Sequence, residues 1–219
     1  MFDTYNPPED HPLKIHYIDD DVLVVDKPSG LLSVPGRGVE KQDCLVSRLA
    51  QIYGEVRIIH RLDMVTSGLM VLALTPEAHR NISGQFERRE TYKKYIADVY
   101  GMPDKQEGYI NQPLLCDWPN RPRQMIDYAL GKKALTYWKV VGETQGNARL
   151  ELAPITGRSH QLRVHCLSIG HPILGDNLYA PPDIVKQTTR LHLHASQLSF
   201  KHPCHGQTLE FSSLEDFPM

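Results

Sequence analysis

The chain has 219 residues, of which 41% are hydrophobic and 23% charged, with a formal net charge of -2. This is enough to bury one large core or two closely packed halves, and no apolar run approaches the roughly 18 residues of a membrane span. Residues 1–10 lack the basic and apolar regions of a signal peptide, so we expect a cytoplasmic protein. The cysteines are widely spaced and form no Cys-x-x-Cys pair, which predicts neither a disulfide framework nor a zinc site.

The predicted elements begin with two short strands in 14–26, on either side of the acidic turn Asp19-Asp20-Asp21. Asp43 is the expected cap of a helix over 44–53, because apolar residues follow it at helical spacing. A buried strand is expected at 69–74. Thr75-Pro76-Glu77 then predicts the start of a helix ending near residue 88, since it combines a capping hydroxyl, an early proline and an acid in the first turn.

A strand is expected at 92–100, and the Pro- and Arg-rich stretch 113–132 is expected to be irregular. Two strands, 134–141 and 149–152, should pair across a turn at 142–147. They precede a helix that opens at Gly157 or Ser159 and closes before Gly170. A final strand pair covers 190–201 and 207–211.

Strands outnumber helices in this pattern, and most connections are too short for parallel crossovers. The sequence therefore predicts an α+β protein whose mixed sheet is mainly antiparallel and is flanked by helices and loops. We expect one domain over residues 1–219, built from two packed half-sheet subdomains.

The run His60-Arg61-Leu62-Asp63, followed by Thr66-Ser67-Gly68 and the apolar strand, holds one carboxylate two residues from a guanidinium. Loops supported by rigid strands are where chemistry usually lies. Asp63 is the only acid in this run, whereas glycoside hydrolysis usually needs two carboxylates. A single ionised carboxylate suits a nucleophile or a base.

A second run, 157–165, places Arg158, His160, Arg163 and His165 around an expected helix start. A helix N-terminus favours anions, so this run could hold an RNA phosphate. Alternatively, Arg163 could keep a carboxylate such as Asp63 ionised and in place. A helix that simply carries basic residues explains this run equally well when it is taken alone.

These runs together resemble the RluA-type pseudouridine synthases. The matching segments occur in family order: Asp26–Leu31, His60–Gly68, Lys94–Ala97, Gly157–His165 and His171–Asp176. They extend over roughly residues 15–200, so the resemblance covers nearly the whole chain. Asp26 departs from the pattern, since most members are expected to have Asn there. The stretch before Lys14 is too short for the S4-type RNA-binding domain that some relatives carry.

The resemblance implies an RNA pseudouridine synthase with a central active-site cleft and neither cofactor nor metal. Asp63 would be the catalytic carboxylate, paired with Arg163. Tyr95 would stack on the target base and help to remove its C5 proton, and Arg61 would fill the space that the flipped uridine leaves. Whether Asp63 attacks C1′, attacks C6 of uracil or takes a sugar proton stays open. Further RNA contacts are expected from His60, Arg158, His160, Lys93, Lys94, Arg121 and Arg123.

These roles agree with the physical demands of the reaction. A stacked base must be extruded before an enzyme can reach it, and an aromatic platform holds it by about 1–3 kcal/mol of stacking. The short chain and the Cys116–Pro122 loop narrow the resemblance to members that act, as expected monomers, on the tRNA anticodon stem-loop and 23S rRNA. The alternatives are a non-catalytic RNA-binding or RNA chaperone protein and a metal-dependent hydrolase. The hydrolase is suggested by clustered histidines: His192, His194, His202 and His205.

Overall fold

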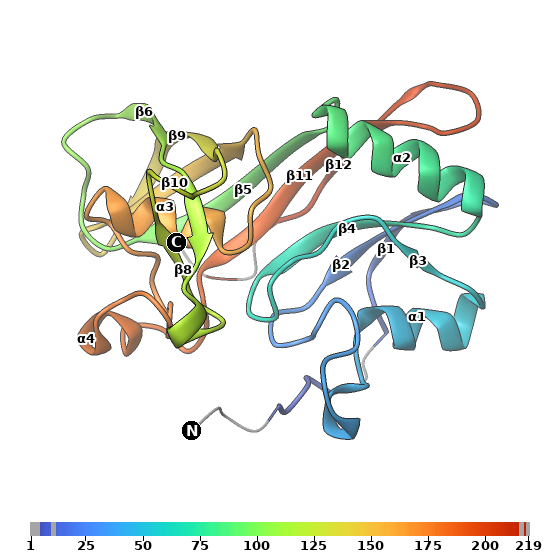
Figure 1. Ribbon diagram of the computed structural model, residues 1–219, viewed down its shortest axis with the longest axis horizontal. Coiled ribbons are helices and arrows are strands. Elements are labelled where there is room, and N and C mark those ends of the chain that lie inside the picture. The colour runs from blue at the N-terminus through green and yellow to red at the C-terminus, as the bar shows by residue number, and fades with distance from the viewer. Residues whose placement is uncertain (1–4, 10–11, 215–216, 218–219) are drawn as a thin grey trace. The chain divides into compact units, whose positions relative to one another are not determined.

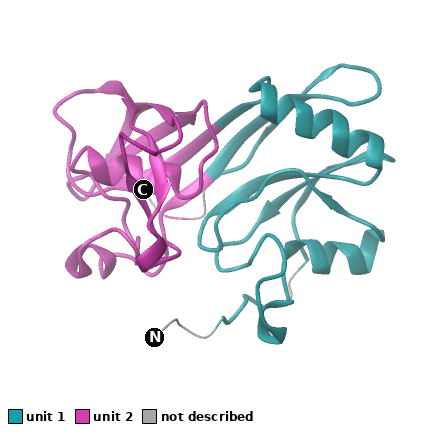
Figure 2. Ribbon diagram, in the orientation of Figure 1, with its two compact units in different colours: residues 1–93, 195–215 teal, residues 94–194, 216–219 magenta. Residues whose placement is uncertain are grey.

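The computed structural model describes residues 5–9, 12–214 and 217 (Figure 1). The chain groups into two compact units: unit 1 comprises residues 1–93 and 195–215, and unit 2 comprises 94–194 and 216–219 (Figure 2). Strands β5 (Tyr92–Val99) and β11 (Leu193–Lys201) each run from one unit into the other. Residues 1–4 and 10, part of the stretch expected not to be a signal peptide, lie outside the described residues. No helix within the described ranges is both long enough and apolar enough to cross a membrane.

Unit 1 is built on a sheet with β2 and β4 at its centre. Its elements, in chain order, are β1 (Ile15–Ile18), β2 (Val22–Lys27), a 3-10 helix (Val39–Lys41), α1 (Leu45–Tyr53), β3 (Arg57–Ile58), β4 (Ser67–Ala73), α2 (Pro76–Arg88) and β12 (Thr208–Ser212). The strand order is β1-β2-β4-β11, with β3 paired to β4 and β12 to β11. All of β4 is buried, and α1 and α2 lie on opposite sides of these strands (Figure 1).

Alternation along the central strands explains the core of unit 1. Val22 and Val24 of β2 share a face with Leu69 and Val71 of β4, and all four are buried against Ile82 of α2. Strand side chains alternate between faces and helix side chains recur every three to four residues, so one apolar stripe meets one apolar face.

The helix starts of unit 1 separate one correct prediction from one wrong one. Thr75 caps α2 as expected, because its hydroxyl accepts the N–H of Ala78 at 3.2 Å. Asp43 does not cap α1. Cys44 does, and its thiol sulfur accepts the N–H of the third helical residue at 3.4 Å. The carboxylate of Asp43 instead binds the guanidinium of Arg48 through two contacts of 2.7 Å, which is the stronger, charge-assisted pairing.

Unit 2 has its own antiparallel strand set in the order β5-β10-β9-β6. Its further elements are β6 (Glu107–Asn111), β7 (Leu114–Cys116), a 3-10 helix (Trp118–Asn120), β8 (Gln124–Ile126), β9 (Leu135–Thr144), β10 (Asn147–Pro154), α3 (Gln161–Ser168) and α4 (Pro182–Val185). Gln145 and Gly146 have φ values of 51° and 77° and form a tight two-residue connection between β9 and β10. Such turns match the twist of paired strands, so the strands extend further than expected.

Two other expectations for unit 2 were wrong. The stretch 113–132 is not simply irregular, since β7 and β8 pair as a hairpin within it. Helix α3 begins at Gln161 rather than at Gly157 or Ser159, because His160 has a left-handed φ of 53° that a helix cannot continue through. Gly170, with φ 86°, follows the helix as expected. The α+β class with mainly antiparallel pairing is confirmed.

Candidate active site

The loop between β3 and β4 carries Arg61 and Asp63, and a loop earlier in the chain holds its backbone. We call residues 28–33 the clamp loop. The hydroxyl of Ser33 donates to the carbonyl of Leu62 at 2.7 Å and accepts the N–H of Leu62 at 3.2 Å. Both Ser33 and Leu62 are buried. Both backbone polar groups of Leu62, the residue between Arg61 and Asp63, are therefore hydrogen-bonded to Ser33.

The clamp also binds the backbone of Met64 and Val65, just after Asp63. The hydroxyl of Ser29 donates to the carbonyl of Val65 at 2.8 Å, and the N–H of Gly30 donates to the carbonyl of Met64 at 2.8 Å. The ammonium of Lys27, 1% exposed, also donates to the Met64 carbonyl at 3.0 Å and to two carbonyls of the clamp loop at 2.9 and 2.7 Å. The Lys-Pro-Ser-Gly run thus holds the backbone of the Asp63 loop in place through hydrogen bonds.

His60 anchors the start of the same loop. Its Nε2 accepts the N–H of Val71 at 3.1 Å, and its ring stacks on Phe86 with centroids 4.6 Å apart. Burial, together with the nearby charge of Lys93, lowers the pKa of His60 to about 3, so the ring is neutral as an acceptor requires. The ammonium of Lys93 lies 5.6 Å from the Phe86 ring centre. A contact of His60 or Lys93 with RNA stays a prediction.

Packing explains the end of the motif. Gly68 has φ +113°, and a Cβ added there would lie 2.4 Å from the carbonyl oxygen of Ala195 and 2.5 Å from its nitrogen. No L side chain fits such a position. The N–H of Thr66 donates to the carbonyl of Asp63 at 3.1 Å and closes the turn. Asp63 itself is half-buried and Arg61 is exposed.

Arg163 lies in unit 2, where it is buried against Asp176, a pairing that the sequence analysis did not predict. Its Nε and Nη2 donate to the carboxylate of Asp176 at 2.8 and 2.6 Å, and the ring of Tyr179 lies 5.2 Å from the guanidinium carbon. Asp176 also accepts the N–H groups of Leu178 and Tyr179 at 3.0 and 3.2 Å. The expected pairing of Arg163 with Asp63 would join the two units and stays a prediction.

The start of α3 is tied to the β7–β8 hairpin. The hydroxyl of Tyr179 accepts the N–H of Gln124 at 2.8 Å and lies 2.7 Å from Nδ1 of His160, to which it can donate. Arg158 donates from Nε to the carbonyl of Lys133 at 3.2 Å. The arginine and histidine expected to contact RNA therefore also shape this end of unit 2.

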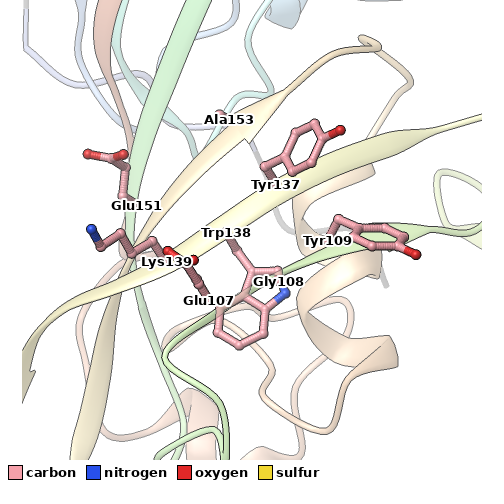
Figure 3. A pocket seen from close by; sticks show the side chains of 8 residues that line it. All are labelled: Glu107, Gly108, Tyr109, Tyr137, Trp138, Lys139, Glu151 and Ala153. Atoms are coloured by element: carbon pink, nitrogen blue, oxygen red, sulfur yellow. The ribbon is translucent and has the colours of Figure 1, made fainter.

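Tyr95 and Lys94 point to opposite faces of β5. Tyr95 is half-buried and lies opposite Leu152 of β10, whereas Lys94 forms an ion pair of 2.7 Å with Glu151. A hollow of about 410 Å³ lies on the Lys94 face, and Figure 3 shows the side chains around it: Glu107, Gly108, Tyr109, Tyr137, Trp138, Lys139, Glu151 and Ala153. Because Glu151 shares the face of Lys94, this hollow is not where Tyr95 would receive a base.

The remaining predicted RNA contacts lie on the β7–β8 hairpin. Arg121 and Arg123 are both exposed, and the guanidinium carbon of Arg121 lies 4.6 Å from the ring centre of Trp118. No group of three or more His, Cys, Asp or Glu side chains in the described part of the chain could hold a metal ion. Two of the histidines that suggested one pair with acids: His192 with Asp98 at 3.0 Å and His202 with Asp19 at 2.8 Å.

With this geometry in place, the comparisons with known proteins decide the family. A family model described as RNA pseudouridylate synthase matches residues 21–168. The chain belongs to the RNA pseudouridylate synthase family. It is 50% identical over 216 residues to the dual-specificity RNA pseudouridine synthase RluA of Escherichia coli (strain K12), covering 98% of this chain and 99% of that protein. The RluA of Haemophilus influenzae is 47% identical over 214 residues, or 97% of this chain and 98% of that protein.

Solved structures agree with the pseudouridine synthase assignment. Human RNA pseudouridylate synthase domain containing 1 has a TM-score of 0.81 and 28% identity, covering 97% of this chain and 87% of that one. Human RNA pseudouridylate synthase domain containing 4 has a TM-score of 0.71 and 26% identity, covering 92% of this chain and 88% of that one. The protein is an isomerase that forms pseudouridine in RNA. This result confirms the resemblance and favours an enzyme over a non-catalytic RNA-binding protein.

Proposed function

We propose that this pseudouridine synthase modifies loop uridines in two kinds of RNA, the anticodon stem-loop of tRNA and 23S rRNA. It would act as a cytoplasmic monomer without cofactor or metal. The observation that carries the proposal is 50% identity over 98% of the chain to a synthase whose name states dual specificity. The Cys116–Pro122 loop, which narrows the resemblance to such members, forms the tip of the β7–β8 hairpin.

Within this function we assign Asp63 the role of the catalytic carboxylate and Arg61 the role of holding the RNA open. Support comes from the clamp. The backbone of Leu62, between these two residues, is held by Ser33 at 2.7 and 3.2 Å. A well-placed reacting group can supply a large part of a rate enhancement, because orientation costs are met before the reaction. Exposed Arg61 has the long planar cation that can occupy the gap left by an extruded base.

We assign Tyr95 to the target base and Arg163 to Asp63. Tyr95 offers an aromatic platform on a sheet strand, which is a rigid support for stacking. Nε and Nη2 of Arg163 donate to the carboxylate of Asp176 at 2.8 and 2.6 Å, which holds the guanidinium in a fixed orientation. A guanidinium has five N–H donors in a planar fork, which is the geometry that binds carboxylates.

The test uses RNA with tritium at C5 of uridine, since C5 loses its proton when it is joined to C1′. The wild-type protein should release tritium from both a tRNA anticodon stem-loop and a 23S rRNA hairpin. The Asp63→Asn variant should bind these RNAs with unchanged affinity and release no label. Asp20→Asn, at an exposed acid of the β1–β2 turn, is the matched control and should keep wild-type release.

Each outcome addresses one part of the proposal. Near-normal release by Asp63→Asn would remove Asp63 from the catalytic role. Release from one RNA class alone would remove the dual specificity. Mapping pseudouridine across total RNA, with and without the protein, would then identify the modified nucleotides.

A further inference from the structure

The tip of the β7–β8 hairpin holds an exposed tryptophan beside an arginine. Trp118 is 65% exposed, and the guanidinium carbon of Arg121 lies 4.6 Å from its ring centre. An aromatic side chain of this size usually buries about 150–250 Å² and dominates the contacts it makes. An indole open to water and paired with a planar cation is the combination that stacks on nucleobases.

The tip is ordered by its own hydrogen bonds. The N–H of Asp117 donates to the carbonyl of Arg123, and the N–H of Arg123 donates to the carbonyl of Asn120, each at 3.0 Å. The amide of Asn120 donates to both carboxylate oxygens of Asp117 at 3.2 and 3.0 Å. Trp118 is therefore held in place by a closed turn, and a rigid platform loses little entropy on binding.

The base of the hairpin is packed into unit 2. Leu114 of β7 is buried with Ala134 and Val164, and Ile126 of β8 packs against this cluster. The N–H of Gln124 donates to the hydroxyl of Tyr179 at 2.8 Å. A hairpin with a buried base and an exposed aromatic tip presents that tip on a fixed support.

The local charge favours an anionic partner. Residues 114–133 carry four cations, Arg121, Arg123, Lys132 and Lys133, against two acids, Asp117 and Asp127, for a net charge of +2 in a chain of net charge -2. All four cations are exposed. Both acids are engaged in turns, since Asn120 binds Asp117 and the N–H groups of residues 129 and 130 donate to Asp127 at 2.9 and 2.8 Å. Exposed aromatic residues interleaved with cations are typical of single-stranded nucleic-acid contacts.

We propose that Trp118 and Arg121 form a stacking site for an unpaired base of the RNA substrate, distinct from the target uridine. Arg121 lies over one side of the indole, and the base stacks on the exposed ring surface. The guanidinium groups of Arg121 and Arg123 contact the flanking phosphates. The proposal rests on the proposed function in one respect, that the substrate is a stem-loop with unpaired bases. RNA is chosen over a protein partner because RNA is the substrate of this family and matches the local positive charge.

The test measures equilibrium binding of two fluorescein-labelled RNAs, a tRNA anticodon stem-loop and a fully paired duplex made from the same stem sequence. Stacking is worth about 1–3 kcal/mol per base, so Trp118→Ala should weaken stem-loop binding about 5- to 150-fold. Trp118→Leu should lose as much, because it keeps apolar bulk without a ring. Trp118→Phe should keep most of the affinity, and duplex binding should not change for any of the three.

Two controls separate stacking from charge and from general surface effects. Tyr109→Ala removes an equally exposed aromatic residue, 68% exposed, from the hollow of Figure 3 and should leave binding unchanged. Arg121→Gln should reduce the slope of log binding constant against log salt concentration by about one, the value for one lost phosphate contact. Trp118→Ala should leave this slope unchanged. Because Trp118 is exposed, melting temperatures should stay at the wild-type value and show that the variants fold.

Three results would overturn the proposal: unchanged stem-loop affinity in Trp118→Ala and Trp118→Leu, equal losses on stem-loop and duplex, or a loss in Trp118→Phe as large as that in Trp118→Ala. If RNA affinity is unchanged, the exposed tip of the hairpin does not bind RNA and a protein partner becomes the favoured occupant. Binding is scored separately from tritium release. A wild-type protein that binds the stem-loop but releases no label would therefore contradict the proposed substrate, while the Trp118 comparison would still be decided.

Discussion

Replacing Ser33 with alanine removes one hydroxyl from the clamp loop and leaves the side chains of Arg61 and Asp63 untouched. The hydroxyl donates to the carbonyl of Leu62 at 2.7 Å and accepts its N–H at 3.2 Å. Alanine can do neither, and little water can replace the lost bonds, because Ser33 is 3% and Leu62 7% exposed. The variant thus loosens the loop between Arg61 and Asp63, the two residues with proposed roles, without changing either one.

The magnitude follows from the two backbone groups left without their bonds. A buried polar group that loses its partner costs about 1–3 kcal/mol, which sums to about 2–6 kcal/mol for two groups. Single substitutions seldom cost more than about 4–5 kcal/mol, so we expect a loss of about 2–4 kcal/mol of folding stability. For a chain of this size each kcal/mol lowers the melting temperature by roughly 2–4 °C. The protein should still fold, since a typical domain is stable by about 5–15 kcal/mol. Misplacement of a reacting group by about 1 Å costs up to roughly a hundred-fold in rate, so kcat should fall about ten- to a hundred-fold.

The assay combines thermal melting with tritium release at saturating RNA. Thr75→Val is the matched control, because the Thr75 hydroxyl also accepts one backbone N–H, at 3.2 Å, and donates one bond, at 2.8 Å to Asp21, but it caps α2. That variant should lose about 1–2 kcal/mol as a lost cap and keep its kcat. If Ser33→Ala melts early while its kcat stays within about two-fold of wild type, the clamp does not position Asp63.

Three further predictions concern buried charges and protons. Asp176→Asn should cost about 3–5 kcal/mol in urea unfolding, because it leaves the buried guanidinium of Arg163 short of its acid partner; a cost below 1 kcal/mol would contradict this. Burial raises the pKa of Asp19, but hydrogen bonds from Tyr17, backbone N–H groups and His202 outweigh it and lower the pKa from 3.8 to about 2. This stabilisation is complete above pH 3.8 and is lost as the pH falls towards 2, so Asp19→Asn should flatten the loss of stability over that range. His60, with a pKa of about 3, should show no change in its ring nitrogen shifts between pH 8 and 5, and a midpoint near 6.5 would refute the buried neutral ring.

Local patterns predicted the elements well wherever the deciding contacts are close in sequence. Thr75, Pro76 and an acid lie within one turn, and α2 begins there. The expectation failed at Asp43, because an arginine five residues away competes for the carboxylate that was expected to cap α1. It failed again at α3, where the left-handed backbone of His160 delays the helix. Neither the sign of a residue's φ angle nor a competing partner for a side chain can be read from the spacing of residues.

The roles predicted for the site residues stay predictions, and the sequence did not indicate the contacts that hold their loop. The motif identified the loop that carries Arg61 and Asp63, but the hydrogen bonds that hold this loop come from Ser33, 29 residues away from Leu62. Asp176 was within a run used for the resemblance, yet its pairing with Arg163 depends on a separation of 13 residues. Such contacts are set by the tertiary fold, and a single sequence offers no periodicity from which to read them.

The clamp and Gly68 have a consequence for how this family can lose its activity. Gly68 is needed because any side chain there would clash with the backbone of Ala195. His60 accepts the N–H of Val71, and Lys27 with the clamp loop binds backbone carbonyls of the Asp63 loop. All of these contacts support the fold, so they would stay necessary in a protein that had lost its activity. With Asp63 and Arg61 in their proposed roles, a descendant that stopped modifying RNA would keep most of the motif to stay folded and would be free to change at these two positions. The residues there, rather than the presence of the motif, would then distinguish a working synthase from an inactive protein of the same fold.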